Sequence, residues 1–264
     1  MASTAPAMEW ARISGQMKSA YSFIVILALL MLPLAGAGEQ ADAAQVYTRS
    51  AAAASEDQAS VIFLFEWEQG RPWISYSIKV QANGKAHFEG DPNAAEAGGG
   101  DPFQQDLMVS EANRQKIFDL AKKVNYFQGD FDYHKKIAQT GKKTLEYQSG
   151  AIHNSATYNW SQNPDLQSLT HIFQGVATTL DYGRKLAYQY RFDKLGMDAR
   201  IRELEQLQQQ GYIEELQAIE PILQKIADDP NLMRISRESA KHLLKSIGSP
   251  GATTTAAQPE ASQL

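Results

Sequence analysis

Three polar side chains stand close together in the sequence and could do chemistry. Asp130, Asp132 and His134 alternate along a short stretch that begins at Gly129. Carboxylates and an imidazole at this spacing could bind a cation, or serve as the acid and base of a hydrolase. A calcium loop supplies further acidic ligands at fixed positions, and none follows here. We therefore interpret the cluster as a solvated loop, with a hydrolase of unfamiliar class that uses a dispersed site as the alternative.

The familiar signatures of enzymes and metal sites are missing. The chain has five histidines and no cysteine, which excludes disulfides, cysteine nucleophiles and thiolate zinc sites. No two histidines have the spacing of zinc ligands, and neither Gly-x-Ser-x-Gly nor Ser-x-x-Lys occurs. The glycines at 98–100 are not followed by the Gly-Lys-Ser/Thr of a phosphate loop. We expect no metal, no cofactor and no catalytic residue, and we favour a non-enzymatic protein.

Four aromatic residues belong to segments with strand-like sequences or lie close to them. Trp67, Trp73, Tyr158 and Trp160 could together form a platform on which sugars or peptides stack. Aromatic residues bury a large apolar surface, however, and dominate the cores of folded domains. We therefore expect them in the core.

The N-terminal segment predicts export. Arg12 and Lys18 precede an apolar run at 20–32, and small residues that fit a cleavage site follow it. This order indicates a bacterial signal peptide over residues 1–37, and hence a periplasmic or extracellular protein. The apolar run is shorter than the roughly 20 residues that span a bilayer. Extended over residues 20–38, the apolar run is marginally long enough to span a bilayer, so an uncleaved membrane anchor is the alternative.

Composition sets the limits of the folded part. Residues 38–59 and 249–264 contain few large apolar residues, so we expect a flexible linker and a disordered tail. The formal net charge of −5 argues against nucleic-acid binding, which needs a basic face. The remainder divides into a predicted α+β domain over residues 60–182 and a helical region over residues 183–248.

The start of the α+β domain predicts a strand and a hairpin. β-Branched and aromatic residues at 61–65 indicate a strand, and apolar residues alternate with polar ones over 74–80. A two-residue turn after this strand would pair apolar with polar positions. A three-residue loop with Gly84 in the left-handed conformation instead pairs Ile78 with Phe88. We predict this bulged loop, because a buried face fixes the register of a strand.

The rest of the domain predicts two helices and a second hairpin. We expect a loop over residues 90–106, after which Ser110 caps a helix. The segments 143–148 and 156–161 predict strands joined by a loose connection. An apolar stripe then indicates a helix over residues 163–180.

The C-terminal part has the periodicity of helices. A turn at residues 228–231 separates two amphipathic segments, which predicts a helical hairpin. The complete fold is therefore expected to be α+β: two antiparallel β-hairpins with helices, followed by a C-terminal helical hairpin. The helices at 212–247 are the surface through which we expect an envelope protein or peptide to bind.

The order of these elements is similar to that of a known family. The hairpin Tyr76–Gly90, the start of a helix at 109–111 and the segment Phe118–Phe127 carry the resemblance. Over about residues 60–180 the chain resembles an exported bacterial domain of unknown function, often found in lipoproteins. Members often carry Cys-Phe-Gly-x-Cys-Pro before the hairpin, whereas residues 69–73 hold no cysteine here. The resemblance implies a small α+β domain and no established activity.

These observations predict a protein of the bacterial cell envelope that works by binding or scaffolding. If the segment 20–38 is not cleaved, the protein would be an extracytoplasmic domain held at the membrane by that segment. No further contact with a membrane is expected from the sequence.

Overall fold

The computed structural model describes residues 59–67, 73–94 and 100–247. The predicted signal peptide and tail, and nearly all of the predicted linker, lie outside these ranges. Among the helices of the described ranges, none is both long enough and apolar enough to cross a bilayer.

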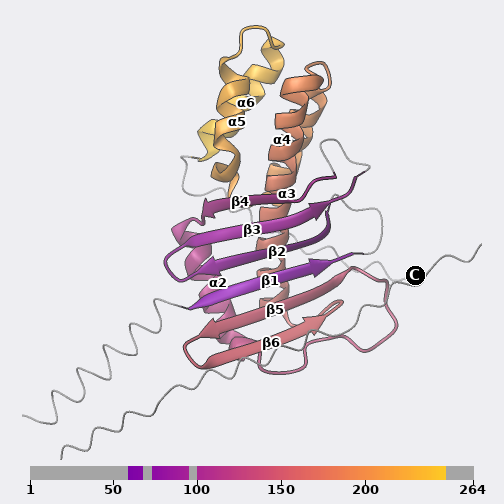
Figure 1. Ribbon diagram of the computed structural model, residues 1–264, viewed down its shortest axis with the longest axis vertical. Helices are drawn as coiled ribbons and strands as arrows, with labels where there is room; N and C mark the ends of the chain where they lie inside the picture. Colours follow the sequence, from indigo (N-terminus) through magenta and orange to yellow (C-terminus); the bar gives the residue numbers. More distant parts are fainter. Residues whose placement is uncertain (1–58, 68–72, 95–99, 248–264) are drawn as a thin grey trace, which may run out of the picture. The chain divides into compact units, whose positions relative to one another are not determined.

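The strands form one six-stranded antiparallel sheet in the order β4-β3-β2-β1-β5-β6 (Figure 1). They are β1 (Ser60–Glu66), β2 (Trp73–Gln81), β3 (Lys85–Pro92), β4 (Phe103–Met108), β5 (Lys142–Ser149) and β6 (Ile152–Tyr158). Both predicted hairpins are present, as β2–β3 and β5–β6, and β1 joins them by pairing with β2 and β5. The prediction of an α+β fold is confirmed.

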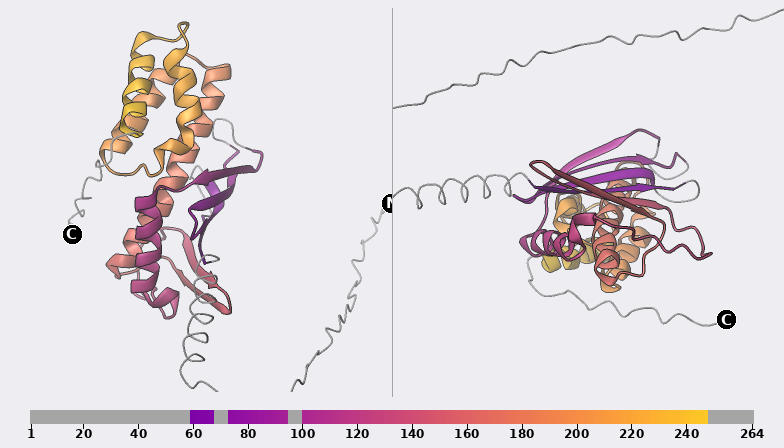
Figure 2. Two further views of the ribbon diagram at one scale, coloured as in Figure 1. Left: turned by 90° about the vertical axis from the view of Figure 1, so that its left-hand side faces the viewer. Right: turned by 90° about the horizontal axis from the view of Figure 1, so that it is seen from below.

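The helices lie on one face of this sheet, as Figure 2 shows. They are α2 (Glu111–Lys123), the 3-10 turn η1 (Asn125–Phe127), α3 (Pro164–Phe192), α4 (Met197–Gln209), the 3-10 turn η2 (Leu216–Ile219), α5 (Glu220–Asp228) and α6 (Arg234–Ile247). α3 crosses behind the sheet, and α4, α5 and α6 form a helical layer beyond the β4 edge (Figure 1). The predicted turn at residues 228–231 and the predicted helical hairpin are confirmed as the α5–α6 pair.

Two predicted helix starts are confirmed by their caps. The Ser110 side chain accepts a hydrogen bond from the backbone N–H of Asn113 at the start of α2. The Asn163 side chain accepts bonds from the N–H groups of Asp165 and Leu166, and Pro164 opens α3. These side chains satisfy backbone donors that have no partner within the helix.

The register of the β2–β3 hairpin is the predicted one. Ile78 pairs with Phe88, both side chains are buried, and Gly84 has a φ of 83°. The three-residue loop therefore keeps the apolar face of both strands toward the helices.

We expect Gly84→Val to lower the free energy of unfolding by about 1–2 kcal/mol, because a β-branched residue is strained at positive φ. Urea denaturation would measure the loss. Gly84→Asn is the matched control, and it should lose less because Asn tolerates the left-handed region. Equal stability of Gly84→Val and the unmodified protein would contradict the register argument.

The predicted loop over residues 90–106 is wrong at both ends. β3 continues to Pro92, and residues 103–108 form the edge strand β4. A polar residue obscured the strand pattern: Gln105 pairs with Phe88 and takes an inward position. Its side-chain amide donates to the Ala218 carbonyl at 2.8 Å, which makes that position tolerable.

The predicted loose connection in the second hairpin is also wrong. β6 begins at Ile152, so only Gly150 and Ala151 separate the two strands. Gly150 takes a φ of 56°, which permits the tight turn. The polar and exposed start of β6 concealed the strand, because its first residues do not contribute to the core.

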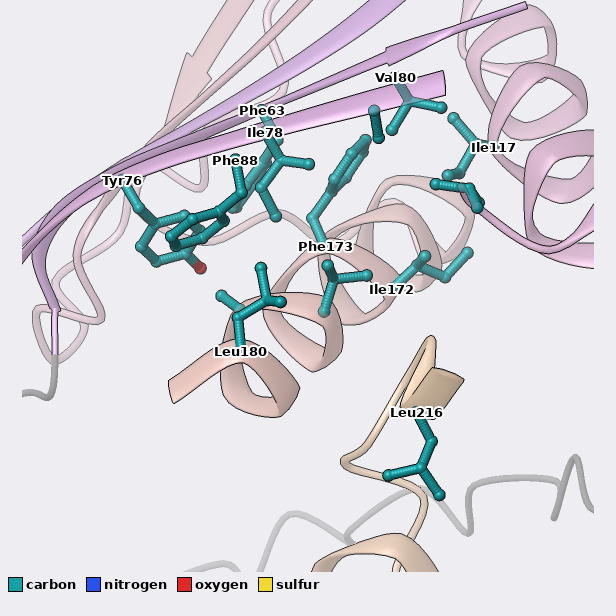
Figure 3. Close-up of a cluster of buried hydrophobic side chains, with 14 of the residues drawn as sticks. Phe63, Tyr76, Ile78, Val80, Phe88, Ile117, Ile172, Phe173, Leu180 and Leu216 are labelled. Atoms are coloured by element: carbon teal, nitrogen blue, oxygen red, sulfur yellow. The ribbon is translucent and has the colours of Figure 1, made fainter. Parts of the chain in front are cut away.

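The core lies between the sheet and α3, and Figure 3 shows its centre. Phe63 on β1 and Phe173 on α3 are fully buried, and their rings stack at a centroid distance of 5.2 Å. Ile78 and Phe88 pack beside them from β2 and β3. Burial of these side chains is the main force that holds α3 against the sheet.

α3 also holds the helical layer. The helix has 29 residues and extends across the predicted domain boundary at residue 182. Its later part contacts α4, α5 and η2. A Cβ atom at Gly183 would lie 2.3 Å from the Ile219 side chain, so η2 crosses α3 at a distance that only glycine allows.

Glu215 joins the helical layer to the sheet layer. Its buried carboxylate accepts hydrogen bonds from the Ser110 N–H and hydroxyl, both at 2.8 Å, and from the Asn113 amide at 2.7 Å. Gln217 donates a further bond. The carboxylate thus caps α2 from a distant part of the chain, which offsets the strain of its left-handed φ of 55°.

Candidate functional site

A groove with a volume of ≈470 Å³ runs along α3, between the ends of β1 and β2 on one side and α4 on the other. Its aromatic and aliphatic walls include Phe65, Trp73, Tyr76, Tyr182, Leu207 and Tyr212. Its polar lining includes His171, Gln174, Thr178, Asp181, Lys185 and Glu203. Apolar walls with a few convergent polar groups are typical of a ligand site.

The helical period of α3 brings the polar groups together. His171, Gln174, Thr178 and Lys185 follow one another at intervals of three, four and seven residues. Side chains at these intervals lie on one side of a helix. The groove therefore follows a stripe of α3 that the apolar pattern of the sequence does not reveal.

A buried ionic cluster forms one end of the groove. Asp181 contacts Arg184 at 2.8 Å and Lys185 at 2.9 Å through its two carboxylate oxygens. The exposed fractions of the three side chains are 3%, 8% and 6%. Desolvation of such charges costs several kcal/mol per ion in proteins, so this cluster is a poor device for stability and a common one at functional sites.

Trp73 fixes the position of the cluster. Its indole N–H donates to the Ala177 carbonyl at 3.2 Å, and the Arg184 guanidinium lies 5.3 Å from the ring centroid. The ring also packs against Phe88 in the core. The wall of the groove is therefore continuous with the core of the sheet.

Tyr182 and Glu203 form the opposite side. Burial raises the pKa of the Tyr182 phenol, and a hydrogen bond with Glu203 raises this pKa further. Glu203 in turn pairs with Arg200 at 2.8 Å. The phenol stays protonated throughout the physiological range and acts as a hydrogen-bond donor.

His171 lies at the other end of the groove. Its Nε2 is 2.7 Å from the Gly211 carbonyl, which can only accept, so Nε2 carries a proton. In the neutral ring Nδ1 is then an acceptor. The imidazole lies 5.9 Å from the ring of Tyr212, so the two side chains together border this end.

The sequence-predicted polar cluster lies outside the groove. Asp130, Asp132 and His134 occupy an exposed loop after η1, and His134 Nε2 is 2.8 Å from an Asp130 oxygen. Asp132 accepts a bond from the Asn159 N–H at 2.8 Å, which ties the loop to the end of β6. Within the described ranges, no three acidic or histidine side chains are placed to hold a metal ion together.

We expect His134 to titrate above its ordinary pKa of 6.5, because the hydrogen bond with Asp130 favours the charged ring. The folded state then gains stability from this pair below pH 6.5, and loses it as the pH rises through the raised pKa. An NMR titration of the imidazole would measure the midpoint. Asp130→Asn should return the midpoint toward 6.5, and an unchanged midpoint would refute the pairing.

The four aromatic residues singled out in the sequence do not form a common platform. Trp73 and Tyr158 are buried in the core, as expected. Trp67 stacks on Phe65, whereas Trp160 is 37% exposed and packs against Tyr133 in the loop after η1. Only Trp73 reaches the groove.

Sequence reasoning missed the ionic cluster. The signal for it was present, since Asp181, Arg184 and Lys185 have the spacing of helical ion pairs and stand among apolar residues. Such a pattern usually marks the solvated side of a helix. Here α3 is covered by the sheet and by the helical layer at this point, so the charges are buried.

No family model matches the chain, and no curated protein matches its sequence. The resemblance of residues 60–180 to an exported bacterial domain therefore stays a prediction.

Proposed function

We propose that the protein is a non-enzymatic binding module of the bacterial cell envelope, and that the groove along α3 holds its ligand. The buried ionic cluster carries this proposal: Asp181 and Lys185 line the groove, and Arg184 pairs with Asp181 behind them. Charges in a low-dielectric wall interact strongly with polar groups of a ligand. The cluster thus gives a binding site that is polar at one point and aromatic along its length.

The lining defines the kind of ligand. Tyr212, which is 52% exposed, offers aromatic surface, and among the described residues none hydrogen-bonds the side-chain amide of Gln174. This combination suits a small molecule, or a short segment of peptide or glycan, that carries flat apolar surface and hydrogen-bonding groups.

The contacts within the groove support binding more than hydrolysis. The Thr178 hydroxyl donates to the Gln174 carbonyl at 2.8 Å, and Lys185 pairs with Asp181. Among the described groove residues, the Thr178 hydroxyl has no general base as its partner, and the Tyr182 phenol that bonds Glu203 is held protonated by its raised pKa. Asp130 and His134 line neither this groove nor the hollow beside His87 and Asp106 on the sheet.

Filling the groove tests the proposal. We would screen envelope metabolites, peptides and glycans by thermal shift and equilibrium dialysis, with Gln174→Trp as the blocking variant. Gln104→Trp, on the open face of the sheet, is the control. The Gln174→Trp variant should lose ligand binding, and the Gln104→Trp variant should keep it. Equal binding by both would overturn the assignment of the groove.

Export is tested separately. Mass spectrometry of the protein recovered from cells would give its mature N-terminus. A start at Gly38 or Ala44 supports a cleaved signal peptide, and a start before residue 20 supports the membrane anchor.

A further inference from the structure

The far end of the helical layer carries a second surface, which we call the tip. It consists of the loop 193–196 between α3 and α4, the turn 229–233 between α5 and α6, and the helix ends beside them. Both views of the ribbon show these two connections at the same end (Figures 1 and 2). Lys194 joins them through an ion pair with Asp229 at 3.0 Å.

Large apolar side chains project from the tip. Leu195 in the loop 193–196 is 84% exposed, Phe192 at the end of α3 is 67% exposed, and Ile235 at the start of α6 is 52% exposed. Tyr188 and Met233 lie beside them and are also exposed. Single exposed apolar residues are ordinary, but a group of them on two neighbouring connections and the adjoining helix ends indicates a contact surface.

The charges of the tip are asymmetric. Two of its carboxylates are neutralised by ion pairs, Asp198 with Arg202 and Asp229 with Lys194, while Asp193 and Asp228 accept from the neutral Gly196 N–H and Gln224 amide and keep their charge. Within the described ranges, no carboxylate lies at ion-pair distance from Arg191, Arg234 or Arg237. The tip therefore combines projecting apolar side chains with arginines available to an anionic partner.

We propose that the tip docks on the surface of an anionic phospholipid bilayer. Phe192, Leu195 and Ile235 enter the boundary between headgroups and acyl chains, while Arg191 and Arg234 bind lipid phosphates. The exposure of these side chains favours a bilayer over a protein, because side chains that project from helix ends and a loop need no matching pocket in a fluid interface. The contact uses no residue that lines the groove and none of the N-terminal segment.

The absence of cysteine allows a direct test on the full chain. A single Met233→Cys variant carries a polarity-sensitive dye at the tip, and Ser155→Cys carries it on the open face of the sheet as a control. Vesicles of phosphatidylglycerol and phosphatidylethanolamine are then added. We expect a blue shift, and quenching by acyl-chain quenchers, at position 233 alone. Attachment through residues 20–38 would move neither dye into the bilayer.

A second variant tests the apolar side chains that are proposed to enter the bilayer. Phe192→Asp with Leu195→Asp, combined with the dye at 233, should weaken the vesicle response by about tenfold or more. Phosphatidylcholine vesicles should give a several-fold weaker response than anionic ones, because they lack the net charge that attracts the arginines. An unchanged dye at 233 would overturn the proposal. So would a shift that grows with protein concentration without vesicles, since that result identifies a second copy of the chain as the partner.

Discussion

Replacing Asp181 with Asn should lower the free energy of unfolding by about 3 kcal/mol. The substitution hardly changes the shape of the side chain, but it removes the carboxylate that both Arg184 and Lys185 contact. Two cations with exposed fractions of 8% and 6% then lose their shared counter-charge in a poorly hydrated wall. Urea denaturation at neutral pH would measure the change.

The matched control is Glu238→Gln, which breaks the ion pair between Glu238 and Lys241. Both of these side chains are about half exposed, at 55% and 46%, so the loss should stay below about 1 kcal/mol. If Asp181→Asn costs no more than this control, the cluster is not the strained buried site described above.

A triple variant separates stability from function. Asp181→Leu, Arg184→Met and Lys185→Met together replace the cluster with apolar side chains, which often restores or improves stability. We expect this variant to unfold at a higher urea concentration than Asp181→Asn while it loses the ligands of the groove. Retained ligand binding would show that the cluster does not serve the groove.

Glu215→Ala is the second substitution with a large expected effect, at about 3 kcal/mol. It removes the charged acceptor of the Ser110 N–H, the Ser110 hydroxyl and the Asn113 amide. Donors in part-buried hydrogen bonds at the start of α2 then lose their charged partner, and the helical layer loses its polar link to α2. Thermal and urea unfolding would both record the change.

Glu214→Ala is the control for this prediction. Glu214 is the preceding residue, it is half-buried, and it accepts one bond from Asn113 at 2.9 Å. Glu214→Ala should lower the free energy of unfolding by less than about 1 kcal/mol. If both substitutions lower the free energy of unfolding equally, packing and not the Glu215 carboxylate holds the helical layer against α2.

The sequence was sufficient where one local rule decided the structure. The parity of apolar residues around Gly84 determined the hairpin register, and Ser110 and Asn163 marked the helix starts. It was insufficient where a distant partner changed the meaning of a residue. Gln105 is inward-facing only because the Ala218 carbonyl, far along the chain, accepts its amide.

The candidate site was hidden for the same reason. Asp181 and Lys185 have the spacing of a solvated helical pair, and only the packing of α3 against Trp73 and the helical layer buries them. Local density of polar residues pointed instead to Asp130 and His134, which are exposed. A sequence pattern gives the intervals between residues along a helix, but not the depth at which that helix is covered.

The continuity of α3 has a mechanical consequence. Lys185 in the groove and Phe192 in the tip belong to the same helix, seven residues apart, which corresponds to about 10 Å along its axis. No loop between them can act as a hinge, so a displacement imposed on the tip is transmitted to the end of the groove. Linkage then requires reciprocity: if docking shifts α3 and changes ligand affinity, the ligand changes the strength of docking by the same factor.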